Sequence, residues 1–215
     1  MKKTFFLIFA IPLLFICTSS KNQSAPNNRL ELIPEPDENL NAYKPPQTSQ
    51  LTCVFSDPDT SLSGIKIDDA QSTLDVLGKE IKLRGDTTHF YYSNDKKQVL
   101  GLKVHAGSAY SQVSIFTVVY AIDEKKPYGK INVKIFETEK RIKLGMPEKE
   151  IIEKLGTCYT VTDSSTSIHE LYYRLELPND SKTKLLERCN MPFYYGKYRF
   201  INNKLSLMEF GFEYP

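Results

Sequence analysis

The chain has 215 residues, with 28 Lys and Arg against 26 Asp and Glu, and a formal net charge of +2. Lys2 and Lys3 account for that excess, so the rest of the chain is formally neutral. A neutral domain lacks the strongly basic surface of a nucleic-acid-binding protein, and we therefore expect no nucleic-acid partner.

The N-terminal residues have the composition of an export signal. Met1–Thr4 is a basic head, residues 5–16 are apolar, and Cys17–Ser20 is a small, polar exit. The apolar run is too short to cross a bilayer as a helix, which needs about 20 residues. We expect residues 1–16 to direct the protein to the bacterial periplasm or the outer membrane.

Leu14-Phe15-Ile16-Cys17 resembles the lipobox of bacterial lipoproteins, in which the cysteine is lipidated and becomes the new N-terminus. The resemblance implies a lipid anchor at Cys17, with the membrane as a partner through that anchor. Ile16 departs from the small residue of the pattern, so cleavage after Ser19 or Ser20, which leaves no anchor, is the alternative.

Residues 17–50 are poor in large apolar residues and rich in Asn, Ser, Pro and Gln. Such a segment buries too little apolar surface to offset the entropy that ordering it would cost. We therefore expect a disordered linker that holds a folded domain away from the membrane.

Two tandem repeats are predicted from residue 51 onward, at 51–138 and 139–215. Each contains a short Ile-Lys segment, a helix that ends at a glycine, and a strand that begins with tyrosines. The matching positions are 65–67, 74–78 and 90–92 in the first copy, and 142–144, 152–156 and 171–173 in the second.

The helices of both copies carry boundary signals. Pro147 suits the first position of a helix, and Gly156 suits its end, where a left-handed backbone is favoured. In the first copy Asp68 or Asp69 is the expected cap, and Gly78 ends the helix.

Long β-branched and aromatic segments predict strands. We expect them at residues 89–93, 98–105, 110–122, 130–136, 157–162, 169–177, 194–201 and 205–213. In the last strand, Leu205, Leu207 and Glu209 are expected on one face. Short turns between the strands indicate antiparallel pairing, and the helices can cover only one side of the sheet. The fold class is thus α+β, with one sheet face left to solvent or a partner.

The segment Leu144–Gly156 resembles the "LGMxxxEVxxxLG" helix of the small bacterial outer-membrane assembly lipoproteins. Two such copies in tandem are similar to the β-lactamase inhibitor protein family, which is built from two helix-plus-sheet repeats. The resemblance implies this fold, and it implies no inhibitory residues.

Three cysteines follow Cys17. An exported protein is in a compartment that permits disulfides, and we predict the pair Cys158–Cys189; the alternative is that Cys53, Cys158 and Cys189 are small buried hydrophobes. No CxxC spacing is present, so we expect no metal site, and we expect no cofactor.

Catalysis has one candidate arrangement, a Cys158 nucleophile with His169, which would make the protein an envelope enzyme using Cys158 or His169. No third group is indicated, so the sequence favours a protein without enzymatic activity.

Tyrosines come as neighbours along the expected strands, and adjacent strand residues point to opposite faces. One member of each pair should enter the core and the other should face outward. Tyrosine is enriched at protein interfaces, so the outward side is a candidate binding face for another envelope protein; ordinary cross-strand packing is the alternative. The candidates are Tyr91, Tyr92, Tyr172, Tyr173, Tyr194, Tyr195 and Tyr198.

Overall fold

The computed structural model describes residues 53–85, 87–123, 125–165 and 167–213, all of which belong to one compact unit. The predicted export signal at 1–16, the lipidation site Cys17 and the linker at 17–50 all precede these residues, so those predictions lie outside what the structure describes. Within the described ranges, no helix is long and apolar enough to cross a membrane.

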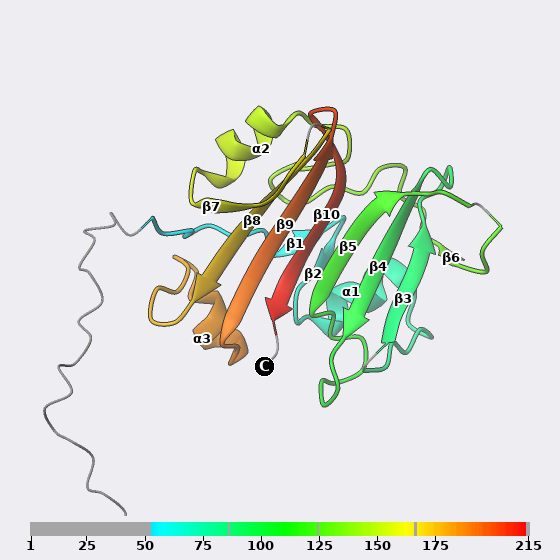
Figure 1. Ribbon diagram of the computed structural model, residues 1–215. Helices are drawn as coiled ribbons and strands as arrows, with labels where there is room; N and C mark the ends of the chain where they lie inside the picture. The colour runs from blue at the N-terminus through cyan, green and yellow to red at the C-terminus, as the bar shows by residue number, and fades with distance from the viewer. Residues whose placement is uncertain (1–52, 86, 124, 166, 214–215) are drawn as a thin grey trace, which may run out of the picture. The chain divides into compact units, whose positions relative to one another are not determined.

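An eight-stranded sheet forms most of the structure (Figure 1). Its strand order is β6-β3-β4-β5-β10-β9-β8-β7, and every neighbouring pair is antiparallel except β3 with β6. The strands are β3 (Thr87–Tyr92), β4 (Gln98–Val104), β5 (Ile115–Tyr120), β6 (Gly129–Lys130), β7 (Tyr159–Ser164), β8 (Ile168–Glu176), β9 (Phe193–Ile201) and β10 (Lys204–Glu213). A small second sheet pairs β1 (Ser61–Leu62) with β2 (Ile65–Lys66).

The described residues also form three short helices: α1 (Ala70–Leu77), α2 (Glu148–Leu155) and α3 (Leu185–Cys189). The predicted α+β class is confirmed. Asp69 caps α1 by accepting a hydrogen bond from the Ser72 N–H, and Gly156 follows α2 with φ of 87°. These boundaries agree with the sequence signals because capping depends on residues next to one another in the chain.

One predicted strand is wrong. Of residues 130–136, only Lys130 lies in a strand, as the second residue of β6. Beyond it, the Val133 carbonyl accepts from the Asn94 N–H at 2.7 Å, and the Phe136 N–H donates to the Gln98 side chain at 2.8 Å. The segment therefore finds hydrogen-bond partners outside a β-ladder, while Phe136 is buried in the core.

A single hydrophobic cluster lies on one face of the sheet. It unites the inward side chains of the strands with residues from β1, β2, α2 and α3, and the side of α1 packs against it. Figure 1 shows α1, β1 and β2 behind the sheet, whose other face is turned toward the viewer. We call these the covered face and the uncovered face.

The last strand departs from simple alternation. A register shift between Leu205 and Leu207 places Leu205 in the core together with Met208, whereas Leu207 stays half-buried. The predicted shared face of Leu205 and Leu207 is therefore wrong. The cause is a β-bulge, in which one extra residue changes the side to which the following side chains point.

Candidate functional site

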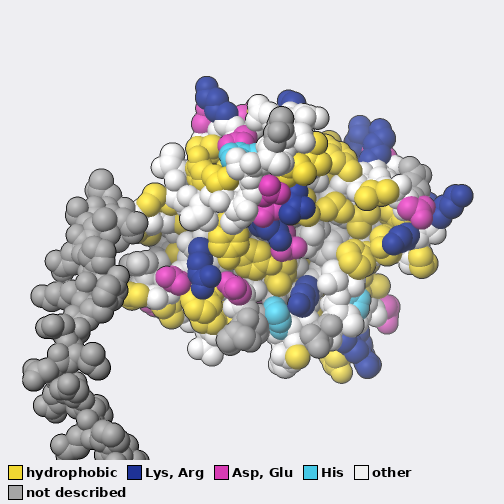
Figure 2. Space-filling view, in the orientation of Figure 1, with side chains coloured by type: hydrophobic (Ala, Val, Ile, Leu, Met, Phe, Trp, Pro, Cys, Tyr) yellow, Lys and Arg dark blue, Asp and Glu magenta, His cyan; other side chains and the backbone are white. Residues whose placement is uncertain are grey.

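The uncovered face is the candidate site because none of the helices in the described part of the chain packs on it. Across its centre, register pairs Gly101 with Thr117, Thr117 with Glu209, and Glu209 with Lys197. These positions alternate with core residues such as Phe116 and Phe210. Figure 2 looks onto this face and shows acidic and basic side chains gathered near its centre, with hydrophobic side chains on both sides.

Most of the predicted tyrosines do not line this face. Tyr173, Tyr194 and Tyr198 are fully buried on the covered side, which corrects their assignment to a binding surface. Their hydroxyls are used internally: Tyr173 donates to the Gly156 carbonyl at 2.9 Å, and Tyr194 donates to the Asp59 carbonyl at 2.6 Å.

The first tyrosine pair is also unavailable. Tyr92 is on the uncovered side but is only 1% exposed, because it donates to the Asp123 carbonyl at 2.5 Å and lies against Tyr128. Tyr91 packs against the core on the other side, with its ring above Gly129. Tyr91 and Tyr92 do point to opposite faces, as the sequence predicts, but contacts with Gly129 of β6 and with Tyr128 and Asp123 of the β5–β6 loop determine how much of each ring is exposed.

Tyr172 and Tyr195 are the two tyrosines of the predicted set that remain half-exposed on the uncovered face. Their rings stack with centroids 6.1 Å apart and an interplanar angle of 18°. Burial raises the pKa of both phenols, and for Tyr195 the adjacent Glu209 carboxylate raises the pKa further. Both hydroxyls therefore stay neutral at physiological pH, as hydrogen-bonding groups and not as bases.

Glu209 organises the polar centre of the face. Its carboxylate accepts from the Tyr195 hydroxyl at 3.0 Å and the Thr117 hydroxyl at 3.0 Å, and it pairs with the Lys197 ammonium at 3.2 Å. A hollow of about 340 Å³ adjoins Glu209, Tyr172 and Tyr195. The hydrogen bonds and the ion pair thus set the positions of the Glu209 carboxylate and the Lys197 ammonium beside this hollow.

A second carboxylate, Glu170, extends the polar network. It is 6% exposed, and it accepts from Arg199 at 2.8 Å and from the Thr162 hydroxyl at 2.8 Å. Nearby, Arg174 lies 4.4 Å from the centre of the Phe193 ring and pairs with Glu213 at 3.4 Å. The half of the face over β8, β9 and β10 is thus polar, with its ionic groups paired across strands.

The half over β3, β4 and β5 has a different character. Phe90 is 40% exposed and lies across Gly101, where a side chain would meet its ring at 3.2 Å. Phe90 also stacks on Tyr128 with centroids 5.0 Å apart. A mainly apolar hollow of about 270 Å³ lies here, lined by Phe90, Val99, Val119, Tyr120, Ile122, Asp123, Lys126 and Tyr128.

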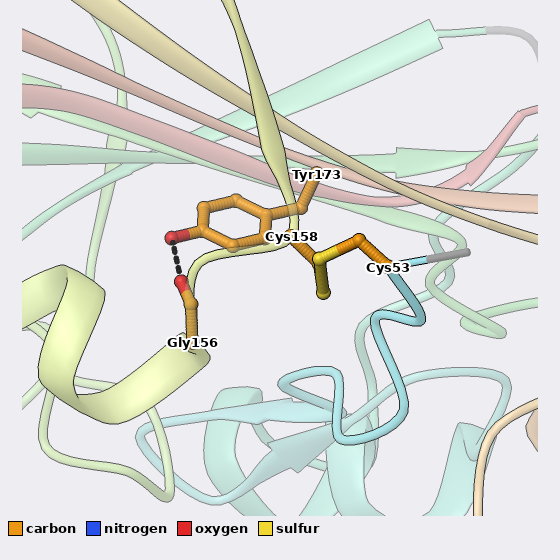
Figure 3. Close-up of a disulfide and its surroundings, with 4 residues drawn as sticks. All are labelled: Cys53, Gly156, Cys158 and Tyr173. Atoms are coloured by element: carbon orange, nitrogen blue, oxygen red, sulfur yellow. Dashed lines mark hydrogen bonds between the residues drawn. A yellow bond between two sulfur atoms is a disulfide. The ribbon is translucent and has the colours of Figure 1, made fainter. Parts of the chain in front are cut away.

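The predicted disulfide is wrong. Cys158 bonds to Cys53, with a Cα–Cα distance of 5.2 Å, and Cys189 is a free, half-buried thiol. Figure 3 shows this bond close to Tyr173, whose hydroxyl reaches the Gly156 carbonyl at the end of α2. The prediction paired the two cysteines of the second predicted repeat, but the tertiary fold brings residue 53 to the start of β7 and places Cys189 at the end of α3.

The candidate catalytic pair is not assembled. Cys158 has no thiol to ionise because its sulfur is in the disulfide. The Nδ1 of His169 lies 2.7 Å from the Glu148 carboxylate of α2. Burial and the neighbouring Asp68 raise the pKa of the Cys189 thiol, which disfavours the nucleophilic thiolate. Within the described ranges, no three His, Cys, Asp or Glu residues are grouped closely enough to hold a metal ion.

Asp59 is an ionisable group that sequence reasoning missed. It is fully buried, and its Oδ2 accepts from the Tyr198 hydroxyl at 3.3 Å. Burial, and then the charge of Glu139, raises the pKa of this carboxyl to about 7. No local pattern marks Asp59, because its burial depends on β9 packing over it.

Comparison with protein-family models, with curated proteins and with solved structures finds no match to this chain. The functional argument therefore depends on the chain's own residues.

Proposed function

We propose that this protein is a non-enzymatic module of the cell envelope that binds another protein through the uncovered face of its sheet. The observation that supports this most is the one-sided covering of the sheet: the helices and residues 53–67 pack on one face, and half-exposed aromatic and charged side chains occupy the other. A face that contains tyrosine, arginine and fixed hydrogen-bonding groups has the composition of a protein interface.

The stacked Tyr172 and Tyr195 are the proposed centre of the contact. Their rings are already fixed, so binding would cost little side-chain entropy. The Glu209 network beside them presents charges in a defined arrangement, which favours selectivity for a complementary partner.

Site-specific photo-crosslinking tests this proposal. A photoreactive phenylalanine analogue in place of Tyr172 is expected to give one discrete protein adduct in the envelope of the source cells. The same analogue in place of Lys149, an 87%-exposed side chain on α2, is the control and is expected to give none. Adding Tyr195→Ala should abolish the adduct from position 172. Equal labelling from both positions, or none from position 172, would contradict the proposal.

The tether is part of the same proposal: Cys17 carries a lipid anchor and residues 17–50 form the linker that presents the domain. The mass of the mature N-terminal peptide tests it. A diacylated or triacylated Cys17 is the expected result, and a free Ser20 or Lys21 would remove the anchor.

We also propose that the domain consists of two repeats. In support, α1 precedes the antiparallel run β3-β4-β5, and α2 precedes β7-β8-β9-β10. The final strands of the two runs, β5 and β10, meet antiparallel at the middle of the sheet. Co-expression of residues 1–138 and 139–215 as separate chains tests this: two genuine units should reassemble into one soluble complex, and aggregation of both would count against them.

A further inference from the structure

The loop between β5 and β6 presents an apolar side chain to solvent. Ile122 is 102% exposed, which means that it makes almost no contact with the rest of the described protein. Tyr120, at 46%, and Phe90, at 40%, are exposed nearby and border the same apolar hollow. Single exposed hydrophobic residues are common, but a contiguous group of them marks a surface that is covered in use.

The loop is held in this position by its own contacts. Tyr128 stacks on Phe90 at 5.0 Å and lies 5.3 Å from Tyr92, whose hydroxyl donates to the Asp123 carbonyl. Asp123 in turn accepts from the Lys125 N–H through its side chain at 2.9 Å. Residues on both sides of Ile122 therefore have defined hydrogen-bond partners, and the Ile122 side chain points into solvent.

Lysines surround this apolar group. Lys125, Lys126 and Lys130 are exposed on the loop, and Lys96 and Lys97 are exposed on the adjoining β3–β4 turn. The two segments are neighbours because the Ala121 N–H donates to the Lys97 carbonyl at 2.9 Å. In Figure 2 basic side chains stand out at the right-hand end of the molecule, where Figure 1 places β3 and β6.

The charge of this end is positive after its acids are included. The acidic residues of the two segments are Asp95, Asp123 and Glu124, against the five lysines. Among the described residues here, Lys97 and Asp95 form an ion pair that is long, at 3.9 Å. The surface thus combines an outward aliphatic side chain, two tyrosines and a surplus of lysine.

We propose that this end of the molecule, residues 121–123 and 125–130 with the 94–97 turn, docks on an anionic lipid bilayer with Ile122 inserted below the headgroups. Tyrosine is favoured at the headgroup level and lysine is attracted to anionic lipid, which matches the order of groups around Ile122. A bilayer fits better than a protein partner, because the Ile122 side chain projects fully into solvent and is bordered by lysines. This docking does not depend on the protein-binding role proposed above.

The absence of tryptophan from the sequence allows a direct test. Ile122→Trp in the full chain places a single fluorescent reporter at the proposed insertion point. Mixed with vesicles of phosphatidylglycerol and phosphatidylcholine, its emission is expected to shift to shorter wavelength, and brominated acyl chains are expected to reduce its intensity. Val161→Trp is the matched control: Val161 is also β-branched, is 46% exposed and lies on β7, at the opposite edge of the sheet.

The control shares every other membrane contact of the chain, including the N-terminal segment, so only the position of the reporter differs. Lys125→Glu with Lys126→Glu in the Ile122→Trp chain should abolish the shift. The shift should also be lost on vesicles of phosphatidylcholine alone. No bromine quenching at position 122, equal quenching at positions 122 and 161, or an equal response to neutral vesicles would each overturn the proposal. Unchanged far-ultraviolet circular dichroism of all variants establishes that they are folded.

Discussion

The two faces of the sheet can be compared through tyrosines that are neighbours in the chain but point to opposite faces. Tyr172 and Tyr195 are half-exposed and stack on each other, whereas their chain neighbours Tyr173 and Tyr194 are fully buried. The buried pair donates to backbone carbonyls in the covering segments. Tyr195, on the uncovered face, donates to the Glu209 side chain. The same residue type thus stabilises the core on one side and forms a surface on the other, and strand alternation decides which.

The two faces also differ in how they are held together. The covered face depends on segments that are distant in sequence, including residues 53–67, α2 and α3. The uncovered face depends on cross-strand ion pairs and hydrogen bonds among its own strands. Substitutions on the covered side should therefore affect stability, and those on the uncovered side should mainly affect recognition.

The largest expected effect comes from replacing the buried member of a tyrosine pair by alanine and comparing it with the same replacement of its half-exposed neighbour. Tyr173→Ala should lower the free energy of unfolding by about 3–5 kcal/mol, because it leaves a cavity among Phe55, Tyr159 and Tyr198. Tyr172→Ala should lower it by about 1 kcal/mol or less, because that ring is half-exposed. Urea denaturation of both variants measures the difference. Equal losses would mean that the uncovered face is packed as tightly as the core.

Next in size is the pH dependence that Asp59 gives to the covered face. Its pKa is about 7 in the folded protein against 3.8 as the ordinary value, so between these pH values the folded state binds the extra proton. The contribution of Asp59 to the free energy of unfolding is therefore fully present below pH 3.8, and it is lost as pH rises through about 7. At about 1.4 kcal/mol for each unit of pKa, the loss is of the order of several kcal/mol.

Asp59→Asn should remove that component of the pH dependence and leave the protein more stable than the parent at pH 8. Urea denaturation from pH 4 to pH 8 measures it. Asp57→Asn is the control, because the Asp57 side chain is 66% exposed. A parent and an Asp59→Asn variant with parallel pH profiles would show that Asp59 ionises normally.

Breaking the disulfide should release the N-terminal end of the covering layer from β7. Cys53→Ser with Cys158→Ser is expected to lower the free energy of unfolding by about 2–4 kcal/mol, because the bond closes a long loop in the unfolded chain. Cys189→Ser leaves the bond in place and should cost less. Thiol titration of the unfolded parent should find Cys53 and Cys158 unreactive without reductant; two reactive thiols from these residues would refute the pairing.

The smallest effect is expected within the uncovered face. Glu209→Gln keeps the shape of the side chain but removes the charge that pairs with Lys197, at an expected cost of about 1 kcal/mol. Glu153→Gln on α2 is the control, since its pair with Lys149 is 3.9 Å long and exposed, and should change stability very little. A loss for Glu209→Gln as large as that for Tyr173→Ala would remove the distinction between the two faces.

Local signals in the sequence were sufficient for much of the fold. The end of α2 follows from Gly156, and its start lies one residue after Pro147, which was predicted as the first helical position. The alternation of Tyr172 with Tyr173 follows from strand geometry. Long-range features were not accessible in this way. The pairing of Cys53 with Cys158 spans 105 residues, and no local pattern indicates it. The bulge at Leu205–Leu207 and the loop that buries Tyr92 likewise changed what strand periodicity alone exposes.

By itself, the sequence determined the approximate positions of α1, α2 and most of the longer strands, and that one face of the sheet would be apolar. Caps, turns and side-chain periodicity act between residues close in the chain, so they can be recognised without the fold. Only the tertiary structure decided which tyrosines stay accessible and that the Asp59 carboxyl is buried away from solvent. It also decided that lysines from two segments lie around Ile122. Burial and proximity depend on which elements pack together, and that depends on the whole chain.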